Sequence, residues 1–410
     1  MRAYREFLRT PSAPRLLGGT LLGRLPNGMG GLAIVLFVRA HGGGYTLAGA
    51  LSALWVVALA AGQPVLGRAM DRYGQPRILL ASALAAAAGF TALAVLGIDT
   101  LALTVAAVLV AGFCTPPLEA GLRALWPTVL PTPAQVRTAY SLDAAAQELI
   151  FTFGPLLVVV VAAVSKAVAL IVTGLLGVAG TVIVASSHSS RRWRGAHRAA
   201  DWAGPLRAPG LRVLVAVFAC VGFALGALSV AAVTYADARH NSSASGLLLA
   251  VNSAGALFGG LLYGSGRHGR GDAGAFTLLL AGLAAGYLPL ALAPALPFMI
   301  PLAFLSGLFL APALAATFTL IDALAPQGTV TEAFAWLVTG MAGGAAAGAA
   351  AAGIMSDHTG VHGAFAGAGA GGLLALAIAL VARSPLTKGS TAAPEPAARV
   401  SAPPRLPDRA

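Results

Sequence analysis

Charged residues are scarce in this chain of 410 residues, and that scarcity decides its class. Only 10% of the residues are Asp, Glu, Lys or Arg, whereas 58% are hydrophobic. A soluble domain carries about 25% charged residues, so an ordinary soluble protein is excluded. The mean hydropathy of +0.82 indicates an all-α integral membrane protein, because helices satisfy their own backbone hydrogen bonds in lipid.

Cysteine is also nearly absent, as are the motifs of several large functional classes. The two cysteines, Cys114 and Cys220, lie in apolar segments, which argues against a disulfide framework. The sequence lacks a Gly-x4-Gly-Lys-Ser/Thr loop for nucleotides, and its histidines lack metal-ligand spacing. No catalytic set is visible on a soluble domain. We therefore expect no enzyme activity, no cofactor and no metal site.

Long hydrophobic runs dominate instead, and the basic residues fall between them. The 26 Lys and Arg outnumber the 14 Asp and Glu, but this placement is typical of membrane topology rather than of nucleic-acid binding. A span needs roughly 20 apolar residues. Twelve spans are predicted near residues 16–38, 46–66, 78–97, 101–124, 139–163, 167–187, 211–235, 244–265, 274–294, 297–321, 330–355 and 362–382.

The distribution of Lys and Arg predicts the orientation of the chain. With the N-terminus in the cytoplasm, nearly every basic residue lies on the cytoplasmic side, and only Arg39, Lys166 and Arg239 lie outside. This asymmetry follows the positive-inside rule. We therefore expect a multi-pass protein of the cytoplasmic (inner) membrane with both termini in the cytoplasm. The first apolar run is interpreted as an uncleaved helix.

Two related halves organise the predicted helices. Residues 1–187 form an N-terminal six-helix half and residues 211–383 a C-terminal one. A basic cytoplasmic connector, residues 188–210, joins them, and the Pro-, Ala- and Ser-rich tail 384–410 is expected to be disordered. Small residues recur in both halves at an almost constant offset: Gly67 and Gly260, Gly112 and Gly307, Pro117 and Pro312, Gly154 and Gly348. Repeated halves are typical of secondary transporters.

The loop predicted between helices two and three carries the most specific motif. It reads Gly67-x-x-x-Asp71-Arg72-x-Gly74-x-x-Arg77. Gly67 allows close helix packing and Gly74 a tight turn. Asp71 can accept hydrogen bonds from the N-terminus of a neighbouring helix, and the arginines can bind carboxylates or lipid phosphates. The pattern resembles the signature loop of the major facilitator superfamily, as found in bacterial transporters.

This resemblance implies both a fold and a mechanism. It implies twelve helices in two six-helix repeats around a central cavity, with transport by rocking of the two halves around a midplane site. In that family the signature loop is thought to latch the halves in the outward-open state. The matching loop after helix eight has Gly264 in place of the acid, so the second latch is degenerate.

Drug–proton exporters of the superfamily supply a closer comparison, from which the chain departs. Many carry an arginine in helix four, four residues before a glycine, whereas Val108 holds that position before Gly112. Gly154 and Pro155 of helix five are retained and are expected to act as a hinge, but the longer glycine pattern is missing. Much of the antiporter signature is therefore absent.

Ionisable residues inside the spans are candidates for transport, since each costs roughly 2.5–3.5 kcal/mol on insertion scales. Arg24, with Asn27 on the same helix face, and Glu148 are predicted at similar depths in helices one and five, so we expect them to pair. The pair either controls protons or is a permanent structural salt bridge. Glu119 and Arg123 in helix four either ease insertion as an i,i+4 pair or carry protons and contact substrate.

Other polar residues favour structural roles. Asp143 and Asp322 are predicted near cytoplasmic helix ends, as gate or lipid-interface residues. Glu332 is predicted in the first turn of helix eleven, where an acid stabilises the helix. Four side chains either line the cavity or pack between helices: Trp55, Gln63, Asn252 and Trp336.

Together these features favour a secondary active transporter. We expect proton-coupled export of a small organic molecule by alternating access. The alternative is uptake, by symport or facilitated diffusion, of a solute such as a sugar or metabolite. A receptor-like or scaffold protein on this fold is a third hypothesis. The expected partners are the substrate, protons and the lipid bilayer, and the protein is expected to be a monomer.

Overall fold

The computed structural model describes residues 2–10, 12–194, 204–241, 243–265 and 273–387, which are mostly helical. The elements are α1 (Arg2–Arg9), α2 (Ala13–Ala40), α3 (Tyr45–Tyr73), α4 (Gln75–Leu96), α5 (Leu101–Phe113), α6 (Leu118–Val129), α7 (Pro133–Val164), α8 (Lys166–Ala185), α9 (His188–Arg192), the 3-10 turn η1 (Gly204–Arg207), α10 (Pro209–Ala238), α11 (Ser243–Ser265), α12 (Ala273–Tyr287), η2 (Leu288–Leu292), α13 (Leu296–Leu308), α14 (Leu310–Leu324), α15 (Val330–Val381) and α16 (Arg383–Thr387). Exposed apolar side chains on the long helices, such as Val57, Val95 and Val160, suit contact with lipid.

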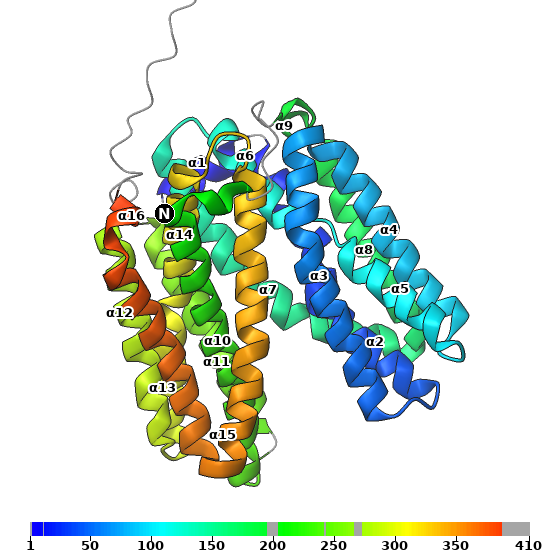
Figure 1. The fold of residues 1–410 in the computed structure, drawn as a ribbon, viewed down its shortest axis with the longest axis vertical. Coiled ribbons are helices and arrows are strands. Elements are labelled where there is room, and N and C mark those ends of the chain that lie inside the picture. Colours follow the sequence, from blue (N-terminus) through cyan, green and yellow to red (C-terminus); the bar gives the residue numbers. More distant parts are fainter. Residues whose placement is uncertain (1, 11, 195–203, 242, 266–272, 388–410) are drawn as a thin grey trace, which may run out of the picture.

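The number of membrane crossings follows from one glycine in the longest helix. In the part of the chain that the structure describes, eleven helical stretches are long and apolar enough to cross a membrane. One of them, α15, has 52 residues and is interrupted at Gly360, where φ is +64°. Glycine adopts a positive φ without a Cβ clash, and the chain reverses there, so α15 supplies two crossings (Figure 1). The twelve predicted spans are therefore confirmed.

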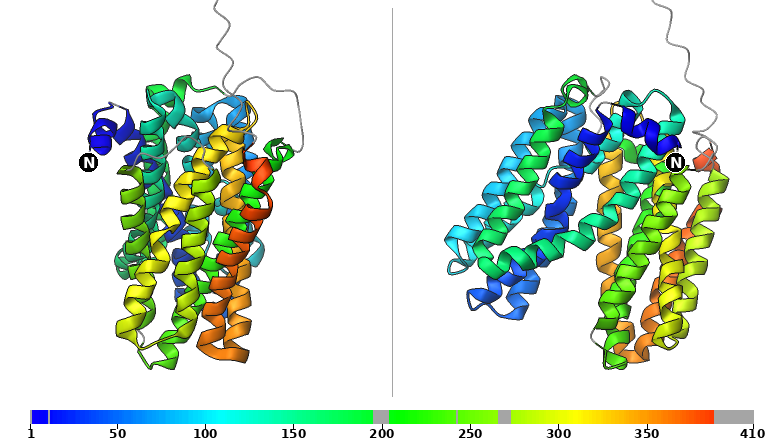
Figure 2. Two further views of the ribbon diagram at one scale, coloured as in Figure 1. Left: turned by 90° about the vertical axis from the view of Figure 1, so that its left-hand side faces the viewer. Right: turned by 180° about the vertical axis from the view of Figure 1, so that it is seen from behind.

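The helices form two bundles that pack together toward one end and separate toward the other (Figure 1). α1 to α9 make the N-terminal bundle and α10 to α16 the C-terminal bundle (Figure 1). The bundles meet at the end that holds α1, α9 and α16, which we call the closed end. They diverge toward the opposite end, the open end, in each view (Figures 1 and 2).

The glycines that mark the sequence repeat make the same kind of contact in each bundle. Gly154 of α7 packs against the backbone of Gly28 in α2, and its repeat partner Gly348 of α15 packs against the backbone of Phe223 in α10. A Cβ at either position would collide with main-chain atoms. Small residues thus bring helices close together in lipid, and the offset found in the sequence reflects a structural repeat.

Helices four and ten are each broken, although both were predicted to be continuous. The fourth span consists of α5 and α6, which are separated where Pro116 and Pro117 supply no N–H donors. The tenth consists of α13 and α14, which meet at Phe309, close to Pro312. The break in the fourth span places Glu119 in the first turn of α6, where the helix N-terminus stabilises its negative charge.

The segment that carries the signature motif is mostly helical rather than a loop. α3 continues to Tyr73 and α4 begins at Gln75, so Gly74, with φ of +87°, is the whole turn. The Gln75 amide side chain donates to the Gly121 carbonyl at 3.0 Å and accepts from Ser190 at 3.2 Å. These bonds hold the turn rigidly against α6 and against α9 of the connector.

The two ends of the chain also differ from expectation. An additional helix, α1, crosses the closed end in contact with α7 and α11 (Figure 2), and Phe7 packs edge-on against Trp126 with ring centroids 5.4 Å apart. At the C-terminus, residues 384–387 belong to α16, and Leu386 is buried. The predicted disorder is therefore wrong for these four residues, because Leu386 packs against the bundle. The rest of the tail lies outside the described residues.

Candidate functional site

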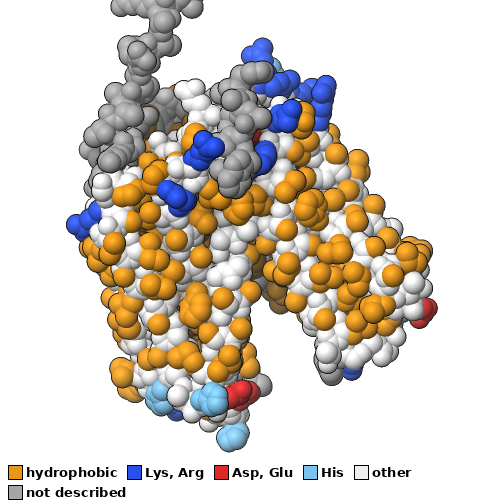
Figure 3. Space-filling model, in the orientation of Figure 1, with side chains coloured by type: hydrophobic (Ala, Val, Ile, Leu, Met, Phe, Trp, Pro, Cys, Tyr) orange, Lys and Arg blue, Asp and Glu red, His pale blue; other side chains and the backbone are white. Residues whose placement is uncertain are grey.

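A cavity of about 840 Å³ lies between the two bundles. The hollow between the two arms in Figure 3 widens toward the open end. Helices of both bundles line the cavity, and most of the lining side chains are apolar. Its polar and charged lining residues include Arg24, Asn27, Glu119, Gln147, Glu148, Ser229, Asn252 and Ser253. Four of the five residues predicted for the cavity therefore line it, and Arg123 lies behind the wall.

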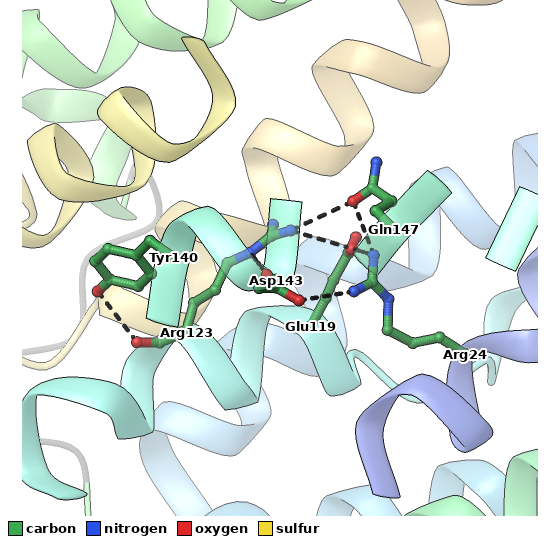
Figure 4. A network of polar contacts seen from close by, with 6 residues as sticks. All are labelled: Arg24, Glu119, Arg123, Tyr140, Asp143 and Gln147. Atoms are coloured by element: carbon green, nitrogen blue, oxygen red, sulfur yellow. Dashed lines mark hydrogen bonds and ion pairs between the residues drawn. The ribbon is translucent and has the colours of Figure 1, made fainter. Parts of the chain in front are cut away.

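Arg24 of α2 is the centre of a buried polar network (Figure 4). Its guanidinium contacts the Glu119 carboxylate of α6, and donates to Asp143 at 3.1 Å and to Gln147 at 2.8 Å, both in α7. All four side chains are more than 90% buried. A buried charge needs such partners, so the break in helix four and the start of α7 together determine where Arg24 can sit.

Arg123 completes the network from one turn further along α6. Its Nε donates to Asp143 at 2.7 Å, and its terminal nitrogen lies 3.5 Å from Glu119. Two arginines therefore share two carboxylates, and the four charges balance. We call Arg24, Glu119, Arg123 and Asp143 the ionic quartet.

The structure contradicts the predicted pair of Arg24 and Glu148. Both residues line the cavity, as their predicted depths require, but Arg24 is paired with Glu119 and Asp143 instead. The predicted position of Asp143 near a helix end was also wrong, because α7 begins at Pro133 and carries this aspartate into the bundle, where it is fully buried. Sequence reasoning missed Gln147, although its spacing of four from Asp143 places both on one helix face.

Glu148 occupies a different environment from the quartet. It lies on the cavity side of α7, facing α11 of the other bundle, where its hydrogen-bonding neighbour is Ser253. Tyr287 of α12 lies close enough to interact electrostatically with it. Within the described part of the chain, Glu148 forms no ion pair. This carboxyl group therefore lies at the interface of the bundles without a bound countercharge.

Asp71 joins the two bundles at the closed end. Its carboxylate accepts hydrogen bonds from the backbone N–H groups of Thr331 and Glu332, at 3.2 and 2.9 Å. Both residues lie in the first turn of α15, whose N-terminus attracts negative charge. Arg68 adds an ion pair with Glu332 at 2.6 Å. Gly67 makes this possible, since a Cβ there would lie 3.0 Å from that of Ala335.

The repeat-related contact on the other side is weaker, as Gly264 in place of an acid predicts. There the Thr138 hydroxyl of α7 donates to the Gly264 carbonyl of α11 at 3.1 Å. Gly260 of α11 packs on Ala145 of α7, which mirrors the packing of Gly67 on α15. Among the described residues, one side of the closed end thus has a helix cap from Asp71 and an ion pair, while α7 and α11 on the other side are joined by the hydrogen bond of Thr138.

An aromatic cluster seals the closed end between these two contacts. Tyr140 of α7 packs against Phe318 of α14 and Phe334 of α15, with centroids 6.0 and 6.2 Å apart. The Arg123 guanidinium stacks over the Phe318 ring, 3.7 Å from its centroid. Arg123 therefore connects the ionic quartet of one bundle to aromatic rings of the other, by a cation–π contact.

The other residues that the sequence singled out lie outside the ionic quartet, and some of them form hydrogen bonds with neighbouring segments. Gln63 donates to the Thr115 carbonyl at 3.1 Å, Asn252 donates to Ser306 at 2.8 Å, and the Trp336 indole donates to Glu332 at 3.4 Å. Trp55 is buried at the cavity wall. Arg72 is exposed and Asp322 lies beside a smaller cavity of about 260 Å³ at the closed end. α7 runs without a break through Gly154 and Pro155, and their hinge role stays a prediction.

Comparison with solved structures shows the same fold at low identity. The human organic anion transporter MFSD10 (TETRAN) has a TM-score of 0.69 and 17% identity, covering 90% of this chain and 99% of that chain. A bacterial homologue of the iron transporter ferroportin, in an outward-facing state, has a TM-score of 0.71 and 14% identity, with 92% and 98% covered. The major facilitator transporter FucP, in the outward conformation, has a TM-score of 0.69 and 15% identity, covering 90% of this chain and 97% of that chain.

The sequence itself identifies the family. No curated protein sequence matches the chain, but the family model described as Major Facilitator Superfamily matches residues 16–265 and 214–406. These ranges include both bundles, the signature motif and the cavity. The chain therefore belongs to the major facilitator superfamily and is a multi-pass membrane protein that transports a small solute.

Proposed function

We propose that this protein is a secondary active transporter that exports a small organic molecule in exchange for protons. The observation that supports this best is a cavity shared by both bundles, with one end sealed by non-covalent contacts between them. Rocking that breaks these contacts while closing the open end would expose the same cavity on the other side. This is alternating access.

The closed end is assigned to the cytoplasm. Basic side chains gather there in Figure 3, and α9 of the connector contributes Arg191 and Arg192. The positive-inside rule places such a surface in the cytoplasm. The cavity then opens to the outside, as the names of two structural neighbours state for those proteins.

Glu148 is the acid best suited to carry the proton. Glu119 and Asp143 are already held in ion pairs by two arginines. Glu148 lines the cavity outside that quartet and faces the opposite bundle. Because its surroundings change when the bundles rock, its protonation can be linked to the conformation. Glu119, which also lines the cavity, is the second candidate.

The test is proton exchange in everted membrane vesicles. Respiration acidifies the interior of these vesicles. Cationic, anionic and neutral organic compounds are then added in turn, and a pH-sensitive acridine dye reports any loss of protons from the interior. At least one compound should release protons in vesicles with the wild-type protein but not with Glu148→Gln. Compound accumulation without any proton release would contradict the proposal, as would full proton release by the variant.

Uptake is the second candidate function, since the fold supports either direction. The discriminating observation is the sign of accumulation in intact cells. Export predicts that cells lacking the protein contain more of the transported compound than cells that produce it. Lower accumulation in cells lacking the protein would identify uptake and would overturn the proposed direction.

A further inference from the structure

The charge of the cavity lining restricts the molecule that it can hold. Arg24, Glu119 and Glu148 are its charged lining residues. The ionic quartet balances Arg24 and Glu119 internally through Asp143 and Arg123. What remains among the described lining residues is the carboxyl group of Glu148, which is negative once it has released its proton. The cavity therefore has one ionisable group without a fixed countercharge, and its deprotonated form is negative.

The rest of the lining is mostly apolar and offers only isolated polar groups. Among them, Asn27 Oδ1 and the Trp55 indole N–H are buried without a hydrogen-bond partner among the described residues. The Gln147 carbonyl already accepts from Arg24, and the Asn252 amide donates to Ser306 and to the Ala303 carbonyl. Large apolar side chains surround them, including Phe151, Leu156, Leu225, Leu249 and Met341. Burial of apolar surface on such a wall contributes about 25 cal/mol per Å², whereas a highly polar solute would lose more hydrogen bonds to water than these few groups can replace.

We propose that the cavity binds organic cations with an apolar body, whose positive group lies against Glu148. This inference rests on the proposed function and names its substrate class. The apolar body would pack on both bundles, while the cation would lie between Glu148 of α7 and Ser253 of α11. The same carboxylate would serve proton and substrate in turn, so that release of one accompanies binding of the other.

Two other substrate classes fit the cavity less well. An organic anion would meet Glu148 and find Arg24 already bound by two carboxylates, so the human organic anion transporter is a structural but not a chemical precedent. A sugar would need many hydrogen-bonding partners, whereas this lining is mostly apolar with a few scattered polar groups. A bare metal ion lacks ligands too, since no three His, Cys, Asp or Glu side chains cluster within the described ranges.

A matched pair of ions tests the proposal directly. Tetraphenylphosphonium and tetraphenylborate carry the same four phenyl rings on opposite charges, so they differ chiefly in charge. Binding of each ion is measured separately by calorimetry, on the full-length protein in nanodiscs of neutral lipid. The variants are Glu148→Gln, which removes the charge with little change in shape, and Glu148→Asp, which keeps it.

The wild-type protein should bind the phosphonium, and Glu148→Gln should weaken this binding about tenfold or more. Glu148→Asp should retain most of the affinity. The borate should bind poorly to the wild type and better to Glu148→Gln, a gain that also shows that the variant is folded. Phosphonium binding that is absent, or unchanged in Glu148→Gln, would overturn the substrate class. The proposed function would still stand in that case if other compounds drove proton exchange in vesicles with the wild-type protein and failed to do so with Glu148→Gln.

Discussion

Arg24 and Arg123 share two carboxylates inside the N-terminal bundle, and this sharing determines what each substitution does. Removing the charge of Arg24 leaves Glu119 and Asp143 with a single arginine, in a site from which water is nearly excluded. Breaking a buried ion pair by removing one partner typically destabilises a protein by about 3–5 kcal/mol. We therefore expect large, non-additive effects on stability when substitutions within the ionic quartet are combined.

Arg24→Gln should lower thermal stability in detergent by an amount equivalent to about 3–5 kcal/mol. Adding Glu119→Gln should recover much of the loss, because the charges balance again. Adding Glu148→Gln should recover none of it, because Glu148 lies outside the quartet. The control is Glu148→Gln alone. Recovery by Glu148→Gln, rather than by Glu119→Gln, would restore the pair that the sequence predicted and refute the quartet.

The sequence located these residues but did not pair them correctly. Counting residues from predicted span ends placed Arg24 and Glu148 at similar depths, which is right. The count assumed straight, continuous helices. The break at Pro116 and Pro117, and the start of α7 at Pro133 rather than near residue 139, moved Glu119 and Asp143 into reach of Arg24. Such tertiary effects are not encoded in hydropathy.

At the scale of elements, the closed end has two repeat-related contacts of unequal strength. Asp71 caps α15 through two hydrogen bonds to its carboxyl group, whereas Thr138 reaches α11 through one hydrogen bond from its hydroxyl group. The motif predicted that Asp71 would accept from a helix N-terminus, and that contact is present. Which helix supplies it became clear only from the structure.

Asp71→Asn should open the closed end more often than Thr138→Val does. Loss of a charge at a helix N-terminus costs up to about 2 kcal/mol, and loss of a neutral hydrogen bond about 1 kcal/mol. The readout is the labelling rate of a cysteine at Leu314, a cavity residue, by an impermeant maleimide in everted vesicles, with Cys114 and Cys220 replaced. The exposed Arg72→Gln is the control. Equal labelling in all variants would refute the latch.

The short C-terminal helix gives a second prediction about elements. Truncation after Thr387 should leave stability and transport nearly unchanged, because it keeps Leu386, which is fully buried. Truncation after Ala382 also removes α16 and should lower stability by roughly 2 kcal/mol, the contribution of one buried leucine side chain. Thermal unfolding and transport are measured on both. Equal behaviour of the two truncations would show that α16 contributes nothing.

At the scale of the whole molecule, the sequence predicted the architecture better than it predicted individual side-chain contacts. Twelve spans, two repeats and the family all follow from long apolar runs and from one motif, and the structure and the family match confirm them. These features were predictable because bilayer thickness imposes helix length. Helix breaks, the crossing of α1 and the shape of the cavity depend on packing between distant segments, which one sequence does not reveal.

The orientation of the whole molecule is tested by reporter fusions. A reporter active only in the cytoplasm should work when fused after Arg192 in α9, at the closed end. A periplasmic reporter should work after Arg239, at the opposite end of α10. Activity of the periplasmic reporter after Arg192 would reverse the assignment of the two ends and, with it, the outward-facing state.

The central claim is that the two bundles rock around the cavity, so that one end closes as the other opens. Spin labels at Tyr73 and Gln327 report the separation of the bundles at the closed end, and labels at Ala40 and Ala238 report it at the open end. All four positions are exposed. Double electron–electron resonance measures both distances, in wild-type and Asp71→Asn backgrounds that lack the native cysteines.

The account predicts opposite changes at the two ends. In the Asp71→Asn background, a population should appear in which the distance between Tyr73 and Gln327 is longer and that between Ala40 and Ala238 is shorter than in the structure. The wild type should be dominated by the arrangement in Figure 1. Distances that stay constant at both ends, or that lengthen together, would contradict alternating access by rocking of the two bundles.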